Sequence, residues 1–123
     1  MGLDMYAYTT DEKIDQTVDF EATGNWACQV HYWRKHPNLH GWMERLYREK
    51  GGKAESFNCV NVMLDAADLD RLEADVKAGR LPETTGFFFG FSDGSEVSDD
   101  LAFIKRARQF IEDGEQVYYR SWW

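Results

Sequence analysis

An apolar stripe between residues 37 and 50 is the feature that most limits what this chain can fold into. Apolar side chains at positions 39, 42, 43, 46 and 47 recur with the spacing of one face of a helix. Pro37 suits the first turn of such a helix, because the N–H that proline lacks would have no partner there, and Gly51-Gly52 ends it. The sequence therefore predicts a helix over 37–50 that needs an apolar surface to pack against.

Strand-like runs supply that surface. Residues 2–8 alternate in polarity, and further strands are predicted over 26–33, 56–64, 86–91 and 116–122, with a long loop over 9–25. Two more helices are predicted over 66–78, capped by Asp65, and over 99–113, opened by Ser98. We expect residues 1–123 to form a single α+β domain, in which one mixed or antiparallel sheet of about five strands carries three helices.

The charge balance excludes two classes of partner. The chain has 14 basic and 22 acidic residues and a net charge of −8. Binding to nucleic acid or to an anionic membrane surface needs a basic face that releases counterions, so we expect neither. No run approaches the length of a membrane span, and the N-terminus lacks the features of an export signal, so we expect a cytoplasmic protein.

Residue type predicts that three further side chains lie in the core. Cys28 and Cys59 each fall in a predicted strand, where a cysteine usually acts as a small buried hydrophobe, and we expect two free thiols and no disulfide. We also expect Trp122, near the end of the last predicted strand, to dock in the core.

Motifs for cofactors and metals are absent from the sequence. Neither a phosphate-binding loop nor a dinucleotide-binding glycine pattern occurs. His31, His36 and His40 lie near Cys28, but strand periodicity sends Cys28 and His31 to opposite faces and no recognised zinc spacing is present. We therefore expect no cofactor and no metal.

A candidate binding site lies where the second strand meets the first helix. Trp33 can stack on a planar ligand, Arg34 can bind a carboxylate or phosphate, and His40 follows within the helix. Asp4, among apolar neighbours in the first strand, would need Arg34, His40 or Arg120 as a partner if it faces inward. The same residues also fit a purely structural role, in which Trp33 is core and Arg34 pairs with Asp4.

The chain resembles a family of small uncharacterised phage and prophage proteins. The resemblance rests on five motifs in order along the whole chain: MGLDMY at 1–6, YWRK at 32–35, HGW at 40–42, GFFFG at 86–90 and YYRSWW at 118–123. Cys28 and the acidic residues within 9–25 lie outside these motifs. The resemblance implies a phage- or prophage-encoded protein of a bacterial host's cytoplasm and implies no particular activity.

Two functions remain open. We favour a non-enzymatic accessory protein that binds a host or phage macromolecule, with a host or phage protein as the expected partner. Its acidic surface could imitate nucleic acid towards a basic host protein, as in a counter-defence inhibitor. The alternative is a protein that binds a small ligand or nucleotide, or a small enzyme, with a site around Asp4, Trp33, Arg34 and His40. The two differ in whether these side chains converge on an open pocket.

Overall fold

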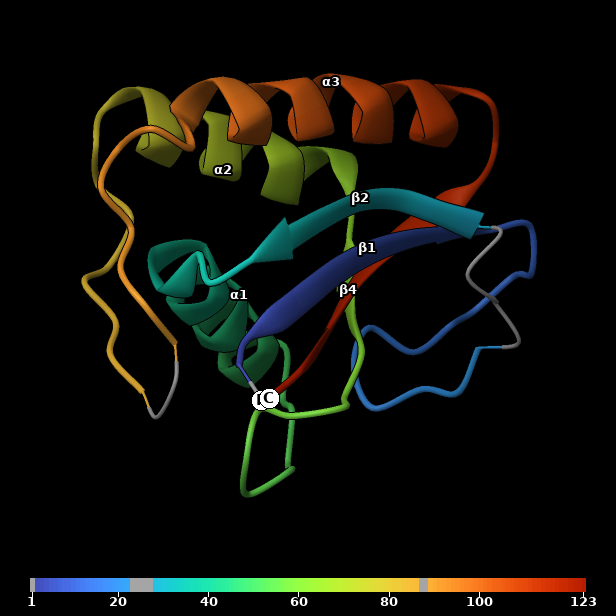
Figure 1. Cartoon of the computed structure of the whole chain (residues 1–123). Helices are drawn as coiled ribbons and strands as arrows, with labels where there is room; N and C mark the ends of the chain where they lie inside the picture. The colour runs from blue at the N-terminus through green and yellow to red at the C-terminus, as the bar shows by residue number, and fades with distance from the viewer. Residues whose placement is uncertain (1, 23–27, 87–88) are drawn as a thin grey trace.

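In the part of the chain that the structure describes, four strands form one sheet, and three helices cover one of its faces (Figure 1). The computed structural model describes residues 2–22, 28–86 and 89–123. The strands are β1 (Asp4–Thr10), β2 (Gln29–Arg34), β3 (Val62–Leu64) and β4 (Gln116–Trp122), in the order β2-β1-β4-β3. Each neighbouring pair is antiparallel. The predicted α+β class is therefore confirmed, with an antiparallel sheet of four strands where about five were expected.

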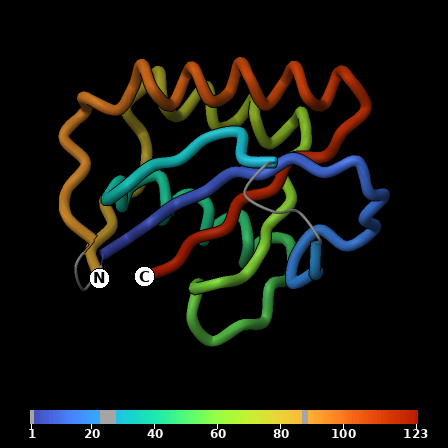
Figure 2. Tube along the Cα trace, turned by 45° about the vertical axis from the view of Figure 1, so that its right-hand side comes forward, coloured from blue at the N-terminus to red at the C-terminus, as the bar shows by residue number. Residues whose placement is uncertain are grey.

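The two central strands come from the two ends of the chain. β1 pairs with β4 along its whole length, from Asp4 opposite Trp122 to Thr10 opposite Gln116. The two termini accordingly lie close together (Figure 2). Met5 and Ala7 are fully buried, as the alternation of the sequence predicted.

The helices are α1 (Pro37–Glu49), α2 (Ala66–Lys77) and α3 (Val97–Glu112), each within two residues of its predicted bounds. Asp65 caps α2 as predicted. Its carboxylate accepts the backbone N–H of Asp68 at 2.8 Å, and the Asp68 carboxylate accepts the N–H of Asp65 at 3.0 Å. At α3 the N-cap is Glu96 rather than Ser98, and no side chain caps it. Buried side chains from all three helices and all four strands form one cluster.

The strand predicted over 56–64 is wrong in its first part, because only Val62–Leu64 joins the sheet. Asn58 binds the last residue of the chain instead: its Oδ1 accepts the N–H of Trp123 at 3.0 Å, and its Nδ2 donates to the Trp123 carbonyl at 3.0 Å. Cys59 has a φ of 58°, which strand geometry does not allow. Cys59 is exposed and Cys28 is half-buried, so neither has the core position that was predicted, and both thiols are free.

The strand predicted over 86–91 is also wrong for the part of it that the structure describes, residues 87 and 88 lying outside the described ranges. The N–H of Phe89 donates to the Gly86 carbonyl at 3.1 Å, and Gly90 has a φ of 76°, which a strand does not allow. Phe89 is buried, but Phe91 is 89% exposed. Gly86, Phe89, Gly90 and Phe91 therefore do not belong to a strand of the sheet.

Part of the predicted loop over 9–25 crosses the edge of the sheet beside β3. Val18 forms a bridge with Val62, the N–H of Met63 donates to the Thr17 carbonyl at 2.8 Å, and the N–H of Asp19 donates to the Asn61 carbonyl at 3.1 Å. This segment also brings Phe20 over the sheet face that the helices leave uncovered, where it packs with Met63 and Tyr118. On the rest of that face Tyr32, Arg34 and Trp122 are exposed, and Tyr6 and Arg120 are half-buried.

Candidate functional site

The sheet face opposite the helices carries a concentration of aromatic and arginine side chains. The pairing places Tyr6 between Tyr32 of β2 and Arg120 of β4, and Asp4 between Arg34 and Trp122. Tyr32 is 42% exposed and Trp122 is 66% exposed. Below, this surface is called the open face. It comprises Asp4, Tyr6, Tyr8, Tyr32, Arg34, Tyr118, Arg120 and Trp122.

Four tyrosine rings on the open face form a continuous row. Tyr6 stacks on Tyr8 with ring centroids 5.7 Å apart and contacts Tyr32 at 5.2 Å. Tyr8 in turn contacts Tyr118 at 5.6 Å. Such contacts hold the rings in place. Tyr118 is 2% exposed and packs against Phe20, so Tyr6, Tyr8 and Tyr32 supply the accessible ring faces and hydroxyl groups of the row.

One end of the row is anchored by a carboxylate. The Tyr32 hydroxyl donates to Asp4 Oδ1 at 2.7 Å, and the Arg34 Nε lies 3.7 Å from the same oxygen. The hydrogen bond to Asp4, with burial as a smaller cause, raises the pKa of Tyr32 to about 12 from its ordinary value of 10.0. The hydroxyl therefore stays a donor to Asp4 throughout the physiological pH range.

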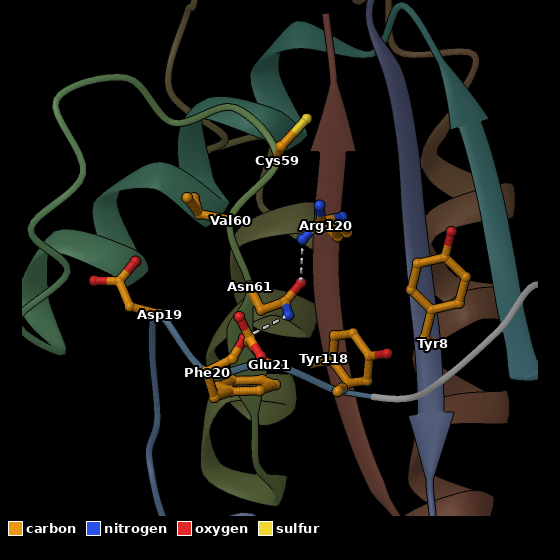
Figure 3. Close-up of a pocket in the computed structure, with 10 residues that line it drawn as sticks. Tyr8, Asp19, Phe20, Glu21, Cys59, Val60, Asn61, Tyr118 and Arg120 are labelled. Carbon is orange, nitrogen blue, oxygen red and sulfur yellow. Dashed lines mark hydrogen bonds between the residues drawn. The ribbon is translucent and has the colours of Figure 1, made fainter.

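The other end of the row borders a cavity of about 600 Å³ (Figure 3). The cavity is lined by the rings of Tyr8, Tyr118 and Phe20 and by the side chain of Arg120. Arg120 donates through Nη1 to Asn61 Oδ1 at 3.2 Å, and the Asn61 amide donates to the Phe20 carbonyl at 2.8 Å. Asn61 is buried, so it fixes both the guanidinium and the segment that closes the cavity.

The five residues predicted as a site do not converge. Asp4, Arg34 and Arg120 lie on the open face, whereas Trp33 and His40 are buried on the helix side of the sheet. Asp4 does not face inward, and its ion pair with Arg34 is exposed, with side-chain exposures of 31% and 58%. The expected core position of Trp122 is wrong, because β4 alternation turns this side chain to the open face.

His40 lies within α1 and is 1% exposed. Its Nδ1 lies 2.7 Å from the Tyr119 hydroxyl, and its ring contacts Phe57 and Phe89. Residues after α2 fold back over this side of α1, so that a Cβ at Gly41 would collide with Thr84. Burial lowers the pKa of His40 to about 4. His40 is therefore a neutral core residue.

Each of the three histidine side chains contacts different residues. His31 lies against Asp99 and Arg106, His36 against Asp100, and His40 against Tyr119. Within residues 2–22, 28–86 and 89–123, no three His, Cys, Asp or Glu side chains gather as the ligands of a metal ion would.

Sequence reasoning missed two features. The alternation within 2–8 already put Tyr6 and Tyr8 on one side, but nothing local showed that the helices leave that side open. The contacts of His36 with Ser92 and Asp100 were also missed, because the partners are 56 and 64 positions away.

Comparison with protein families, with curated proteins and with solved structures finds no match to this chain. In the part of the chain that the structure describes, no helix has both the length and the apolar character needed to cross a bilayer.

Proposed function

We propose that this protein is a phage- or prophage-encoded accessory protein that binds a host or phage protein through the open face. The observation that supports the proposal best is the row of packed tyrosines, flanked by Trp122 and the two arginines. Tyrosine, tryptophan and arginine are the residues that contribute most to the energy of protein interfaces. Because the rings are already held by one another, binding would order few side chains.

The cavity beside the row gives the interface a place for an anchoring side chain. Its volume of about 600 Å³ is large enough for an aromatic or long aliphatic group, and the rings of Tyr8 and Tyr118 offer it apolar contact. Arg120 adds a cation at the cavity, which suits a carboxylate or backbone carbonyl of the partner.

The overall charge favours a protein over a nucleic acid as the occupant. Tyrosine rings also stack on the unpaired bases of single strands. A net charge of −8, however, repels phosphates, and on the open face Arg34 is already paired with Asp4. That the acidic surface imitates nucleic acid, as in a counter-defence inhibitor, stays a prediction. Some of the carboxylates on the helices are already neutralised by ion pairs, as Asp70 and Glu73 are by Arg108.

The test compares the proteins that the wild-type chain and two variants capture from a bacterial host lysate, quantified by mass spectrometry. Tyr32→Ala and Trp122→Ala each remove an exposed ring from the open face. Phe91→Ala is the matched control, because it removes an exposed ring from the segment between α2 and α3. We expect to find a protein that is captured by the wild type and by Phe91→Ala but by neither Tyr32→Ala nor Trp122→Ala.

The captured protein is then purified and titrated against each variant by calorimetry. We expect each open-face substitution to weaken binding at least about tenfold, equivalent to about 1.4 kcal/mol. Equal affinity of all variants would show that the open face is not the interface. Tight binding of a single-stranded oligonucleotide that Tyr32→Ala abolishes would replace the protein partner with a nucleic acid.

A further inference from the structure

A chain of hydrogen bonds joins a serine, a histidine and an aspartate at the start of α1. Ser92 Oγ lies 2.6 Å from His36 Nδ1, and His36 Nε2 lies 2.8 Å from Asp100 Oδ2. The other oxygen of Asp100 accepts the indole N–H of Trp33 at 3.0 Å, and Ser92 Oγ accepts the backbone N–H of Asn38 at 3.1 Å. This cluster is separate from the open face.

The donors and acceptors of the cluster fit one arrangement of protons, in which Ser92 donates to His36 and His36 donates to Asp100. The indole N–H of Trp33 can only donate, so Asp100 acts as an acceptor. With the ring proton on Nε2, His36 donates to Asp100, and its bare Nδ1 accepts the hydroxyl proton of Ser92. Serine hydrolases arrange a serine, a histidine and a carboxylate in the same order. In them Nε2 faces the serine and Nδ1 faces the carboxylate, whereas here Nδ1 faces Ser92 and Nε2 faces Asp100.

The three side chains are held by different elements but reach a common cavity. His36 precedes α1, Asp100 belongs to the first turn of α3, and Ser92 lies in the segment between α2 and α3. His36 is 3% exposed and Asp100 1% exposed, while Ser92 is half-buried. All three line a cavity of about 200 Å³, together with Leu81 and Val97. The base and its carboxylate are therefore shielded from water, and the hydroxyl borders a space that a short acyl group can enter.

We propose that Ser92 is a nucleophile that hydrolyses small carboxylic esters, with His36 as its general base and Asp100 as the residue that positions His36. Ser92 Oγ bonds to the ester carbonyl carbon while its proton passes to His36 Nδ1. The carbon–oxygen bond to the alcohol then breaks, and His36 gives the proton to the leaving alkoxide. Water attacks the resulting acyl-serine, loses a proton to His36 and releases the carboxylic acid, and the proton returns to Ser92.

The first turn of α1 supports the charge that develops in this reaction. The Asn38 N–H donates to Ser92 Oγ, so the N-terminus of a 13-residue helix lies at the reacting atom. Its partial positive charge stabilises the negative charge that develops on Ser92 Oγ as the hydroxyl proton passes to His36. Glu96 is the other acid facing His36, with its Oε2 3.8 Å from Nδ1. The backbone N–H groups of Asp93 and Gly94 hold that carboxylate.

The experiment treats the full chain with a fluorophosphonate probe, which forms a bond from Ser92 Oγ to phosphorus and releases fluoride. Peptide mass spectrometry locates the label, and release of p-nitrophenol from p-nitrophenyl acetate measures turnover. We expect the label on Ser92 of the wild type, and neither label at that position nor turnover above background in Ser92→Ala. Absence of label from Ser92 in the folded wild type overturns the proposal, whatever the variants do.

A matched control is available in the same segment. The Ser95 hydroxyl donates to Asp93 Oδ1 at 2.6 Å, so Ser95 has a carboxylate neighbour but no imidazole in that contact. Ser95→Ala should label as the wild type does. His36→Gln should slow labelling of Ser92 at least about 100-fold, the scale of general-base catalysis. Labelling that is equally fast in His36→Gln would contradict the role of the imidazole.

Asp100 is tested with two substitutions. In Asp100→Asn the amide oxygen can still accept the Trp33 N–H, which places the amide N–H₂ against His36 Nε2 and forces the ring proton onto Nδ1, so labelling of Ser92 should slow at least about 100-fold. Asp100→Glu keeps the carboxylate and should recover part of that rate, whereas a purely structural role predicts that every folded variant labels as fast as the wild type. Thermal melting of each variant confirms that it is folded at the assay temperature.

Discussion

Acidification should destabilise this protein through His40, a residue that looks like a surface histidine in the sequence. It is 1% exposed, beside the Tyr119 hydroxyl and the rings of Phe57 and Phe89. Its burial lowers the pKa to about 4 in the folded protein, against 6.5 in an exposed histidine. Folding therefore requires the neutral imidazole, whereas the unfolded chain takes up a proton readily below pH 6.5.

The size of the effect follows from linkage. Above pH 6.5 both states hold His40 neutral, and its full contribution to stability is present. As the pH falls from 6.5 towards 4, the unfolded state binds more protons, and the free energy of unfolding drops by about 1.4 kcal/mol per pH unit. Between pH 7 and pH 5 the expected loss is about 2 kcal/mol, a large part of the roughly 5–15 kcal/mol that stabilises a typical domain.

The measurement compares urea unfolding of the wild type and His40→Asn at pH 7 and pH 5. Asparagine does not titrate, and its amide can still reach the Tyr119 hydroxyl. All other titrating groups are common to both proteins, so they cancel in the difference. We expect the wild type to exceed the variant in stability at pH 7 and this advantage to shrink by about 2 kcal/mol at pH 5. An advantage that stays constant would show that His40 is not held neutral by burial.

Three further predictions concern the helix and the open face. Gly41→Ala should lower the melting temperature in spite of alanine's helix propensity, because the new Cβ collides with Thr84, and Thr84→Gly should restore part of the loss. Asp4→Asn should change the free energy of unfolding in urea by less than about 1 kcal/mol, because its pair with Arg34 is exposed. In the same variant the pKa of Tyr32 should fall from about 12 towards 10.0, as measured by ultraviolet absorbance against pH.

Each of the three has a result that would contradict it. A Gly41→Ala variant as stable as the wild type would mean that the segment over α1 can shift without loss. A loss of several kcal/mol in Asp4→Asn would mean that this carboxylate acts as a buried partner. An unchanged Tyr32 titration would remove the hydrogen bond to Asp4 as the cause of the shift.

The sequence predicted best those helices that begin or end at a proline, a glycine or a capping side chain. Pro37 and the two glycines after α1 bound its apolar stripe, and the Asp65 cap marked the start of α2. The last strand was predicted at Gln116–Trp122, as observed. In each case the hydrophobic period and the capping residues agree, so the local sequence suffices.

The failures share a different cause. The segments 56–61 and 86–91 contain apolar and aromatic residues that suit a strand. The Asn58 side chain, however, binds the backbone of Trp123, and Gly90 has a φ of 76°, which a strand does not allow. Apolar composition indicates that a segment is buried, but it does not distinguish a buried strand from a buried loop. The same limit applied to the site. Alternation placed Tyr6 and Asp4 on one side of β1, but only the packing of three helices decides which side is open.

The place of β4 in the sheet has a consequence for how the chain acquires its structure. β4 is the last element in the sequence, yet it lies between β1 and β3 and pairs with both. During synthesis the helices can form early, but the middle of the sheet stays vacant until residues 116–122 have left the ribosome. Closing a loop of nearly the whole chain length is slow compared with local pairing. We therefore expect folding to be rate-limited by docking of β4, and nascent chains that lack it to expose β1 to aggregation.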